Sequence, residues 1–267
     1  MKMFKFALFC AAAIVLVACE PKEVTCEVCG QDPCVCGTGS DYVNPISVED
    51  GSLADWDALP TEYVATATLP EGCSMDGLKS IKVYADELYI NLAVEYDPEI
   101  ITDLGWPGFH VYIDTDNNST TGGFGGQWSE AAFDVLLETA IFSSGEPNPY
   151  NPAVFYWWGE VGASGWEVID PALGEPVAEN KWGAIIGEGE APIGNSQHVG
   201  NVFEIQLMWE LIPTPSGTPS TAPWGDVIKL GVDIQQNWTT AGLLPAAADD
   251  ETGATVTAAP LTVKFNK

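Results

Sequence analysis

Apolar and polar residues alternate along much of this chain with the spacing of a β-strand. In the run INLAVEYD, Ile90, Leu92 and Val94 lie on one side of an extended chain, and the residues between them lie on the other. The run IKVYA precedes it across Asp86 and Glu87, so we expect the two runs to pair as a hairpin. Further strand-like runs cover residues 109–114, 133–142, 153–161, 201–209, 226–235 and 260–265.

These short runs are separated by turns rich in Gly and Pro, which is typical of an all-β domain. Residues 127–142 also have the Ala, Glu and Leu content of a helix, but the pattern favours a strand. Residues 213–223 contain several prolines without backbone donors, so we expect a surface loop there. The sequence therefore predicts one antiparallel β-sandwich, jelly-roll-like, over residues 45–267.

The first eighteen residues have the form of a secretory signal. Lys2 and Lys5 precede an apolar run from Phe6 to Val17, which is shorter than the roughly 20 residues of a spanning helix. The ending LVAC resembles a bacterial lipobox, which implies cleavage before Cys19 and a lipid on its thiol. The alternative is a plain secretory signal followed by a chance cysteine. A lipid would tether the domain to the bacterial outer membrane, facing the surface or the periplasm.

Residues 19–44 are predicted to form a stalk. It carries four close cysteines, Cys26, Cys29, Cys34 and Cys36. The segment has too few apolar residues to form its own core. Outside the cytoplasm, four close thiols are expected to form two disulfides. A tetrahedral Zn²⁺ site is the alternative, and the connectivity cannot be read from the spacing. Cys73 stands alone.

The charge of the chain narrows the class of partner. It has 38 acidic residues and 9 basic ones, all of them Lys. A chain without Arg lacks the planar fork that recognises phosphate and carboxylate groups. Strong negative charge also repels nucleic acid. We therefore exclude nucleic-acid binding, while neutral glycans and cations remain compatible partners.

Four segments together resemble a known group of domains. ISVEDGSLADWDALP resembles the opening motif of family 9 carbohydrate-binding modules and of DOMON-like sandwiches, although Glu49-Asp50-Gly51 departs from the usual V-D-G order. IKVYADELYINLAVEYD resembles the hairpin that follows, and FHVYIDTDNNSTTGG resembles the D-x-D-x-x-x-x-T-G loop. GVDIQQNWTTAGLLP is similar to the final strand and loop of Bacteroidota-type surface lipoproteins. The resemblance implies a β-sandwich and a binding module. Trp56 is expected to be a core residue.

The run DTDNNSTTGG after residue 113 raises the question of a metal. Asp114, Asp116 and Asn118 alternate as the first ligands of a calcium loop do. However, Ser119 replaces the glycine that an EF-hand loop needs, and the final Glu is missing. A calcium ion would need another carboxylate, for which Asp134 is the expected donor and Glu130 a second candidate. The alternative is a long turn whose side chains bond their own backbone.

Aromatic residues provide the candidate sugar contacts. Trp157 and Trp158 are adjacent on a predicted strand and must face opposite ways, so both cannot lie in the core of a two-layer sandwich. We expect an exposed aromatic among Tyr156, Trp157, Trp158 and Trp166 to stack on a neutral sugar. Four more could line a loop-end site: Trp128, Trp182, Trp224 and Trp238.

The motifs of common enzyme classes are missing from the sequence, including G-x-S-x-G, H-E-x-x-H and the P-loop. We therefore expect a non-catalytic surface lipoprotein that binds a neutral oligo- or polysaccharide. The alternative is a structural or adhesion lipoprotein whose sandwich is a spacer and a protein-contact module. A third hypothesis uses the DOMON side of the resemblance, in which some members bind haem through His and Met. Here His110 and Met208 would be the ligands.

Overall fold

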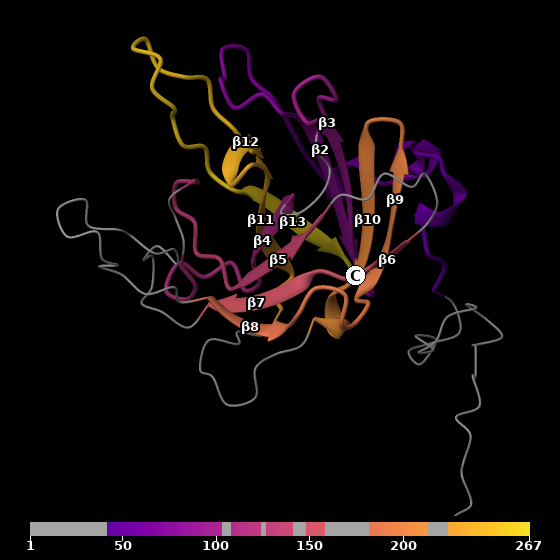
Figure 1. Ribbon diagram of the computed structural model, residues 1–267. Helices are drawn as coiled ribbons and strands as arrows, with labels where there is room; N and C mark the ends of the chain where they lie inside the picture. Colours follow the sequence, from indigo (N-terminus) through magenta and orange to yellow (C-terminus); the bar gives the residue numbers. More distant parts are fainter. Residues whose placement is uncertain (1–41, 103–107, 124–126, 141–147, 158–181, 213–223) are drawn as a thin grey trace, which may run out of the picture. The chain divides into compact units, whose positions relative to one another are not determined.

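The computed structural model describes residues 42–102, 108–123, 127–140, 148–157, 182–212 and 224–267. Within these residues the chain forms thirteen β-strands and four short 3-10 turns (Figure 1). The all-β prediction is confirmed. No helix in the described part of the chain is long and apolar enough to cross a membrane.

The strands follow the chain in this order: β1 (Val64–Thr68), β2 (Leu78–Asp86), β3 (Tyr89–Tyr96), β4 (Phe109–Asp114), β5 (Val135–Thr139), β6 (Asn148–Tyr150), β7 (Ala153–Trp157), β8 (Trp182–Ile186), β9 (Gly194–Val199), β10 (Val202–Met208), β11 (Val227–Gln236), β12 (Thr239–Leu244) and β13 (Leu261–Asn266). The 3-10 turns are η1 (Val48–Asp50), η2 (Ala54–Ala58), η3 (Thr61–Tyr63) and η4 (Trp209–Leu211).

The strands form one continuous, curled sheet rather than two separate ones. Its order is β6-β9-β10-β3-β2-β13-β11-β4-β5-β7-β8, with β1 added to β2 and β12 added to β11. Strand β13 joins the two halves, because it pairs antiparallel with β11 and then parallel with the end of β2. The remaining pairs are antiparallel, so the fold is sandwich-like with one parallel contact at the corner.

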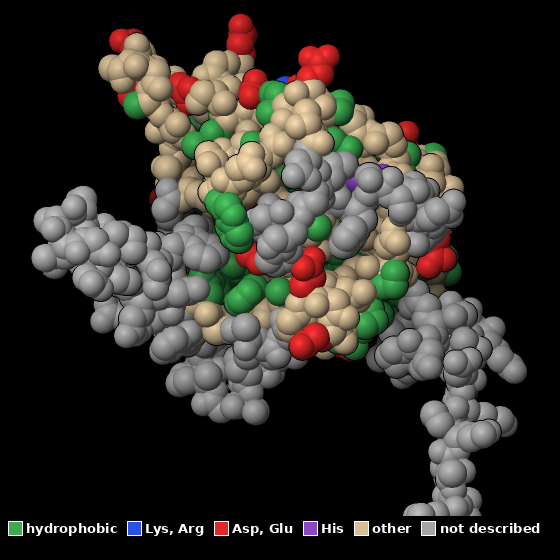
Figure 2. Space-filling model, in the orientation of Figure 1, with side chains coloured by type: hydrophobic (Ala, Val, Ile, Leu, Met, Phe, Trp, Pro, Cys, Tyr) green, Lys and Arg blue, Asp and Glu red, His purple; other side chains and the backbone are tan. Residues whose placement is uncertain are grey.

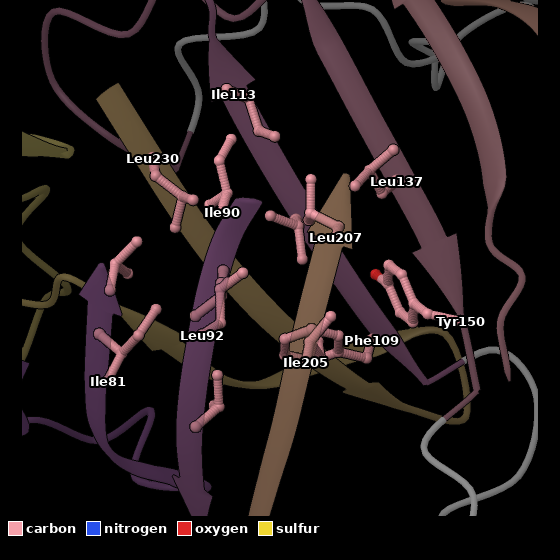
Figure 3. Packing of buried hydrophobic residues seen from close by; sticks show 14 of the residues in the cluster. Ile81, Ile90, Leu92, Phe109, Ile113, Leu137, Tyr150, Ile205, Leu207 and Leu230 are labelled. Carbon is pink, nitrogen blue, oxygen red and sulfur yellow. The ribbon is translucent and has the colours of Figure 1, made fainter. Parts of the chain in front are cut away.

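The main core lies between the two halves of the sheet. Alternate residues of β2, β3 and β10 face alternate residues of β4, β5 and β11 (Figure 3). Leu92 and Ile205 come from one half, and Phe109 and Leu230 come from the other; all four are fully buried. This is the burial that period-two patterning requires of a sandwich.

The outer face of one half is covered by the segment before β1, residues 45–63, which we call the cover segment. Trp56 is 5% exposed and packs there with Ile46, Tyr84 and Ala93. Its indole Nε1 donates to Glu204 Oε1 at 2.7 Å. The interpretation of Trp56 as a core residue is therefore confirmed.

The outer face of the other half is covered by the β4–β5 connection, residues 115–134, in its described parts. Side chains of this connection and of the sheet form a second cluster, which we call the outer aromatic core: Tyr112, Trp128, Ala131, Phe133, Leu136, Trp157, Trp182 and Leu243. Its rings pack closely, with Trp157 and Trp182 edge to face at 5.3 Å between centroids. Two glycines allow this packing, because a Cβ at Gly123 would overlap the indole of Trp157, and one at Gly231 would overlap Trp128.

Most predicted strands are present within the described residues. The expected hairpin is formed by β2 and β3, which turn at Glu87. Residues 135–139 form β5, so the strand interpretation is confirmed there and the helix alternative is wrong. The signal, Cys19, the stalk with its cysteine cluster, and residues 213–223 lie outside the described residues. Cys73 is a free, half-buried thiol.

Candidate functional site

Three aspartates meet where the β4–β5 connection leaves and rejoins the sheet. Asp114 is the last residue of β4, and Asp134 immediately precedes β5. Because these strands pair antiparallel, with Ile113 opposite Val135, the two carboxylates lie near each other on the outer face. Asp116 reaches the same place from the start of the connection. One carboxylate oxygen from each of the three lies within 4.8 Å of the others.

Each of the two buried aspartates uses one oxygen within the protein. Asp134 Oδ2 accepts bonds from the backbone N–H of Thr115 at 2.9 Å and from its hydroxyl at 3.0 Å. Asp114 Oδ1 accepts a long bond of 3.3 Å from the backbone N–H of Asn118. The other oxygens, Asp134 Oδ1 and Asp114 Oδ2, are buried and have no hydrogen-bond partner. Both side chains are 1% exposed or less, so unmade bonds of this kind are expensive.

Burial and the neighbouring charges raise the pKa values of both Asp114 and Asp134. Burial raises the pKa of Asp134 to about 7, and the charges of Asp116 and Asp114 add to the effect. Burial likewise raises the pKa of Asp114 to about 6, and the neighbouring Asp116 charge raises it further. The cluster is thus a place where negative charge is poorly compensated by the protein itself.

The other two expected ligands have different roles. The side-chain oxygen of Asn118 accepts bonds from the backbone N–H of Thr120 at 3.0 Å and from its hydroxyl at 2.7 Å. Asn118 thus closes a local turn, and it meets Asp114 and Asp116 through its backbone N–H. Glu130 is exposed and is not one of the three clustered acids. Turn chemistry therefore shapes the loop while the aspartates converge.

The expected aromatic contacts need correction. Tyr156 is 4% exposed and belongs to the main core, whereas Trp157 is 1% exposed and belongs to the outer aromatic core. The two do face opposite ways, but both faces of β7 are covered, because the β4–β5 connection adds a layer that a two-layer sandwich lacks. Neither therefore offers an exposed ring. Trp158 and Trp166 lie outside the described residues.

The four further tryptophans also separate clearly. Trp128 and Trp182 are buried in the outer aromatic core, and Trp224 is half-buried against Trp209. Trp238 is 73% exposed and is the one aromatic side chain in the described part of the chain that is exposed rather than buried or half-buried. Residue type alone could not rank these four tryptophans. Position along the chain could have identified Trp238 as exposed, because it lies in a two-residue hairpin turn.

The turn holds Trp238 in an unusual backbone conformation. Gln236 pairs with Thr239, so Asn237 and Trp238 alone connect β11 to β12. Their φ angles are +50° and +64°. Such turns favour Asn followed by Gly, and a bulky residue with positive φ is an outlier that costs about 1–3 kcal/mol. The side chain of Gln236 fixes the base of the hairpin by accepting from the backbone N–H of Thr102 at 3.1 Å.

A buried ionic network lies on the outer face beside the aromatic core. His110 Nδ1 is 2.5 Å from Asp233 Oδ1, and its Nε2 is 3.1 Å from Glu138 Oε2. Burial lowers the pKa of His110, but the charge of Asp233 and the bonds to both carboxylates outweigh it and raise the pKa to about 10. Both ring nitrogens are therefore engaged in an imidazolium pair with two carboxylates. This leaves neither nitrogen to ligate iron, which argues against the haem reading.

Comparison of the chain with protein-family models, with curated proteins and with solved structures finds no match.

Proposed function

We propose that this protein is a lipid-anchored, non-catalytic surface domain that binds a neutral oligo- or polysaccharide. Lipidation at Cys19 tethers it to the bacterial outer membrane, and the sandwich presents the binding face. The observation that carries the proposal is Trp238, an aromatic ring held out into solvent by a strained turn. Strained backbone at exposed positions is retained where it serves binding.

The surroundings of Trp238 suit the chemistry of a sugar. An indole face provides apolar area for the C–H face of a pyranose ring, and nearby polar groups fix the hydroxyls. Asn237 and Thr239 flank the ring along the chain, both exposed. Thr102, also exposed, is bonded to the base of the same hairpin. These neighbours are neutral, so they favour an uncharged ligand.

The charge of the whole chain supports the same choice. Asp and Glu exceed Lys by 38 to 9, and Arg is missing. Figure 2 shows acidic side chains spread over the visible face with almost no basic ones. Anionic polysaccharides would be repelled over such a surface. Neutral glycans avoid this repulsion.

The test is a glycan array probed with the mature protein. We expect binding to neutral glycans with a dissociation constant on the order of micromolar to millimolar, as for one shallow site. Trp238→Ala should remove most of the binding, and Trp238→Phe should restore part of it. Trp158→Ala and Trp166→Ala test the aromatic segment that the sequence offers as the other candidate, and they should bind as the wild type does.

Two outcomes contradict the proposal. Full binding by Trp238→Ala, with loss in Trp158→Ala or Trp166→Ala, would move the site to the earlier aromatic segment. An array on which no neutral glycan binds the wild type would reject glycan binding altogether. The spacer and adhesion reading would then take its place.

A further inference from the structure

The two ends of the β4–β5 connection meet in a cluster of like charges. Asp114 and Asp116 stand at its start and Asp134 at its end, with one oxygen of each within 4.8 Å of the others. Oxygen ligands around one Ca²⁺ lie 2.3–2.6 Å from the ion, and therefore at most about 5 Å from each other. The spacing of the cluster fits one ion of that size.

The unpartnered oxygens supply the independent observation. Asp114 Oδ2 and Asp134 Oδ1 are buried and have no hydrogen-bond partner, whereas the second oxygen of each carboxylate is held by a backbone N–H. The protein thus fixes the direction of each carboxylate and leaves one oxygen of each unused. Buried polar atoms in native proteins are otherwise nearly always satisfied.

Nearby positive charge is too small to explain the cluster. Lys229 lies opposite Asp114 across the β11–β4 pair and attracts it. Among the residues that the structure describes, one ammonium thus faces three carboxylates there. The buried imidazolium of His110 is already bonded to Asp233 and Glu138. A turn held by hydrogen bonds alone would have no use for three converging carboxylates.

We propose that Asp114, Asp116 and Asp134 bind one Ca²⁺ that clamps the two ends of the β4–β5 connection. Ca²⁺ accepts several carboxylates in flexible geometry, and backbone carbonyls and water complete its 6–8 ligands. Mg²⁺ demands near-ideal octahedral geometry and keeps its waters, and Zn²⁺ favours nitrogen and sulfur ligands. The calcium site is independent of the glycan proposal and is tested by separate measurements.

The clamp has a consequence for the outer face of the sheet. The clamped connection carries Trp128, whose indole N–H donates to the carbonyl of Pro245 at 3.0 Å. It also carries Gln127, which donates to Asp233 Oδ2 at 2.7 Å. Both contacts depend on the connection lying flat against the sheet. The ion therefore fastens the layer that closes the outer aromatic core.

Calorimetric titration of the chelator-treated mature protein with CaCl₂ tests the site. We expect one ion per chain with a dissociation constant on the order of 10⁻⁴–10⁻³ M, as in extracellular modules, and weaker binding of MgCl₂. Asp114→Asn and Asp134→Asn should each weaken Ca²⁺ binding about 10–100-fold, since each removes a charged ligand. Asp57→Asn, an equal charge change at an exposed site, should bind Ca²⁺ as the wild type does.

Thermal melts distinguish an ion site from a hydrogen-bonded turn, because the two predict opposite changes in the Tm of the aspartate variants measured in EDTA. At Ca²⁺ about 100-fold above the dissociation constant, the wild-type Tm should rise by about 5–10 °C over its value in EDTA. Asp114→Asn and Asp134→Asn should lose this rise, yet melt in EDTA at or above the wild-type temperature, because they remove repulsion. If both variants melt lower than wild type in EDTA and Ca²⁺ shifts no protein, the turn reading is correct. Absence of Ca²⁺ heat in the wild type overturns the proposal even if a variant fails to fold.

Hydrogen exchange of the wild type tests the clamp itself. Removal of Ca²⁺ should speed exchange in residues 115–123 and 127–134 by at least about tenfold and leave β2 and β3 unchanged, because local opening follows local stability. Equal protection of the connection with and without Ca²⁺ would reject the clamp.

Discussion

The strained turn at Trp238 predicts a stability difference between two substitutions at this position. Trp238→Gly and Trp238→Ala both delete the indole, and they differ in the backbone that each residue tolerates. At φ +64° a glycine is unstrained, while an alanine keeps the left-handed penalty. We expect the glycine variant to be more stable than the alanine variant by about 1 kcal/mol.

The indole itself contributes modestly to stability. Trp238 is 73% exposed, so roughly a quarter of its area is hidden. For a side chain that buries about 150–250 Å² when enclosed, that quarter is about 40–60 Å², worth at most about 1–1.5 kcal/mol at 25 cal/mol/Å². The alanine variant should therefore have a free energy of unfolding lower than that of wild type by about this amount. The glycine variant should have a free energy of unfolding close to that of wild type, because relief of the backbone strain offsets loss of the indole.

Thermal unfolding followed by circular dichroism compares the two variants. A difference of 1 kcal/mol corresponds to about 2–4 °C in Tm for a domain of this size. Both variants should lose glycan binding equally, because binding needs the ring and stability needs the turn. An alanine variant as stable as the glycine variant would refute the strain, and with it the argument that the turn is retained to present the indole.

Three further predictions address the cover segment, the outer aromatic core and the anchor. Burial raises the pKa of Glu204 from its ordinary 4.5 to about 7 in the folded protein. The folded state therefore binds this proton more tightly than the unfolded state, and the stabilising contribution of the protonated group is complete below pH 4.5 and is lost as the pH rises through 7. Glu204→Gln should therefore raise the free energy of unfolding at pH 8 by up to about 3 kcal/mol and flatten the slope between pH 4.5 and 7; an unchanged slope in urea titrations would contradict this. Gly123→Ala should destabilise the fold by about 1–3 kcal/mol, because the new Cβ overlaps the indole of Trp157; unfolding midpoints equal to wild type would show that the ring yields freely. Cys19→Ala should move the protein from the membrane to the soluble fraction, and retention on membranes after fractionation would refute lipid anchoring.

The sequence predicted the elements whose signal is local. Phe109, Val111 and Ile113 alternate with polar neighbours, and they form one face of β4 as the pattern indicates. Strands such as β6 and β9 were missed, because residues like Asn148, Pro149 and Gln197 have little strand preference. Those strands are held by pairing with a neighbour, which local pattern does not reveal.

For the candidate sites too, features set by neighbours in the sequence could be predicted, and features set by distant residues could not. The alternation of Asp114 and Asp116 indicated a metal loop, and proximity in sequence suggested Asp134, which the structure brings to them. The unpartnered oxygens depend on the antiparallel β4–β5 register and could not be read from spacing. Trp157 was misjudged because its cover comes from a connection folded back over the sheet, which alternation along one strand cannot report.

The most direct test of the proposed function follows the indole N–H signals of the tryptophans by ¹⁵N NMR during titration with a neutral oligosaccharide. Each of the 10 Trp residues contributes one signal, and comparison with Trp238→Phe assigns that of Trp238. The proposal predicts that the Trp238 signal shifts in a saturable way, while those of the buried Trp128 and Trp157 stay in place. A titration in which the ligand binds but the Trp238 signal does not move, or in which no neutral oligosaccharide moves any indole signal, would contradict it.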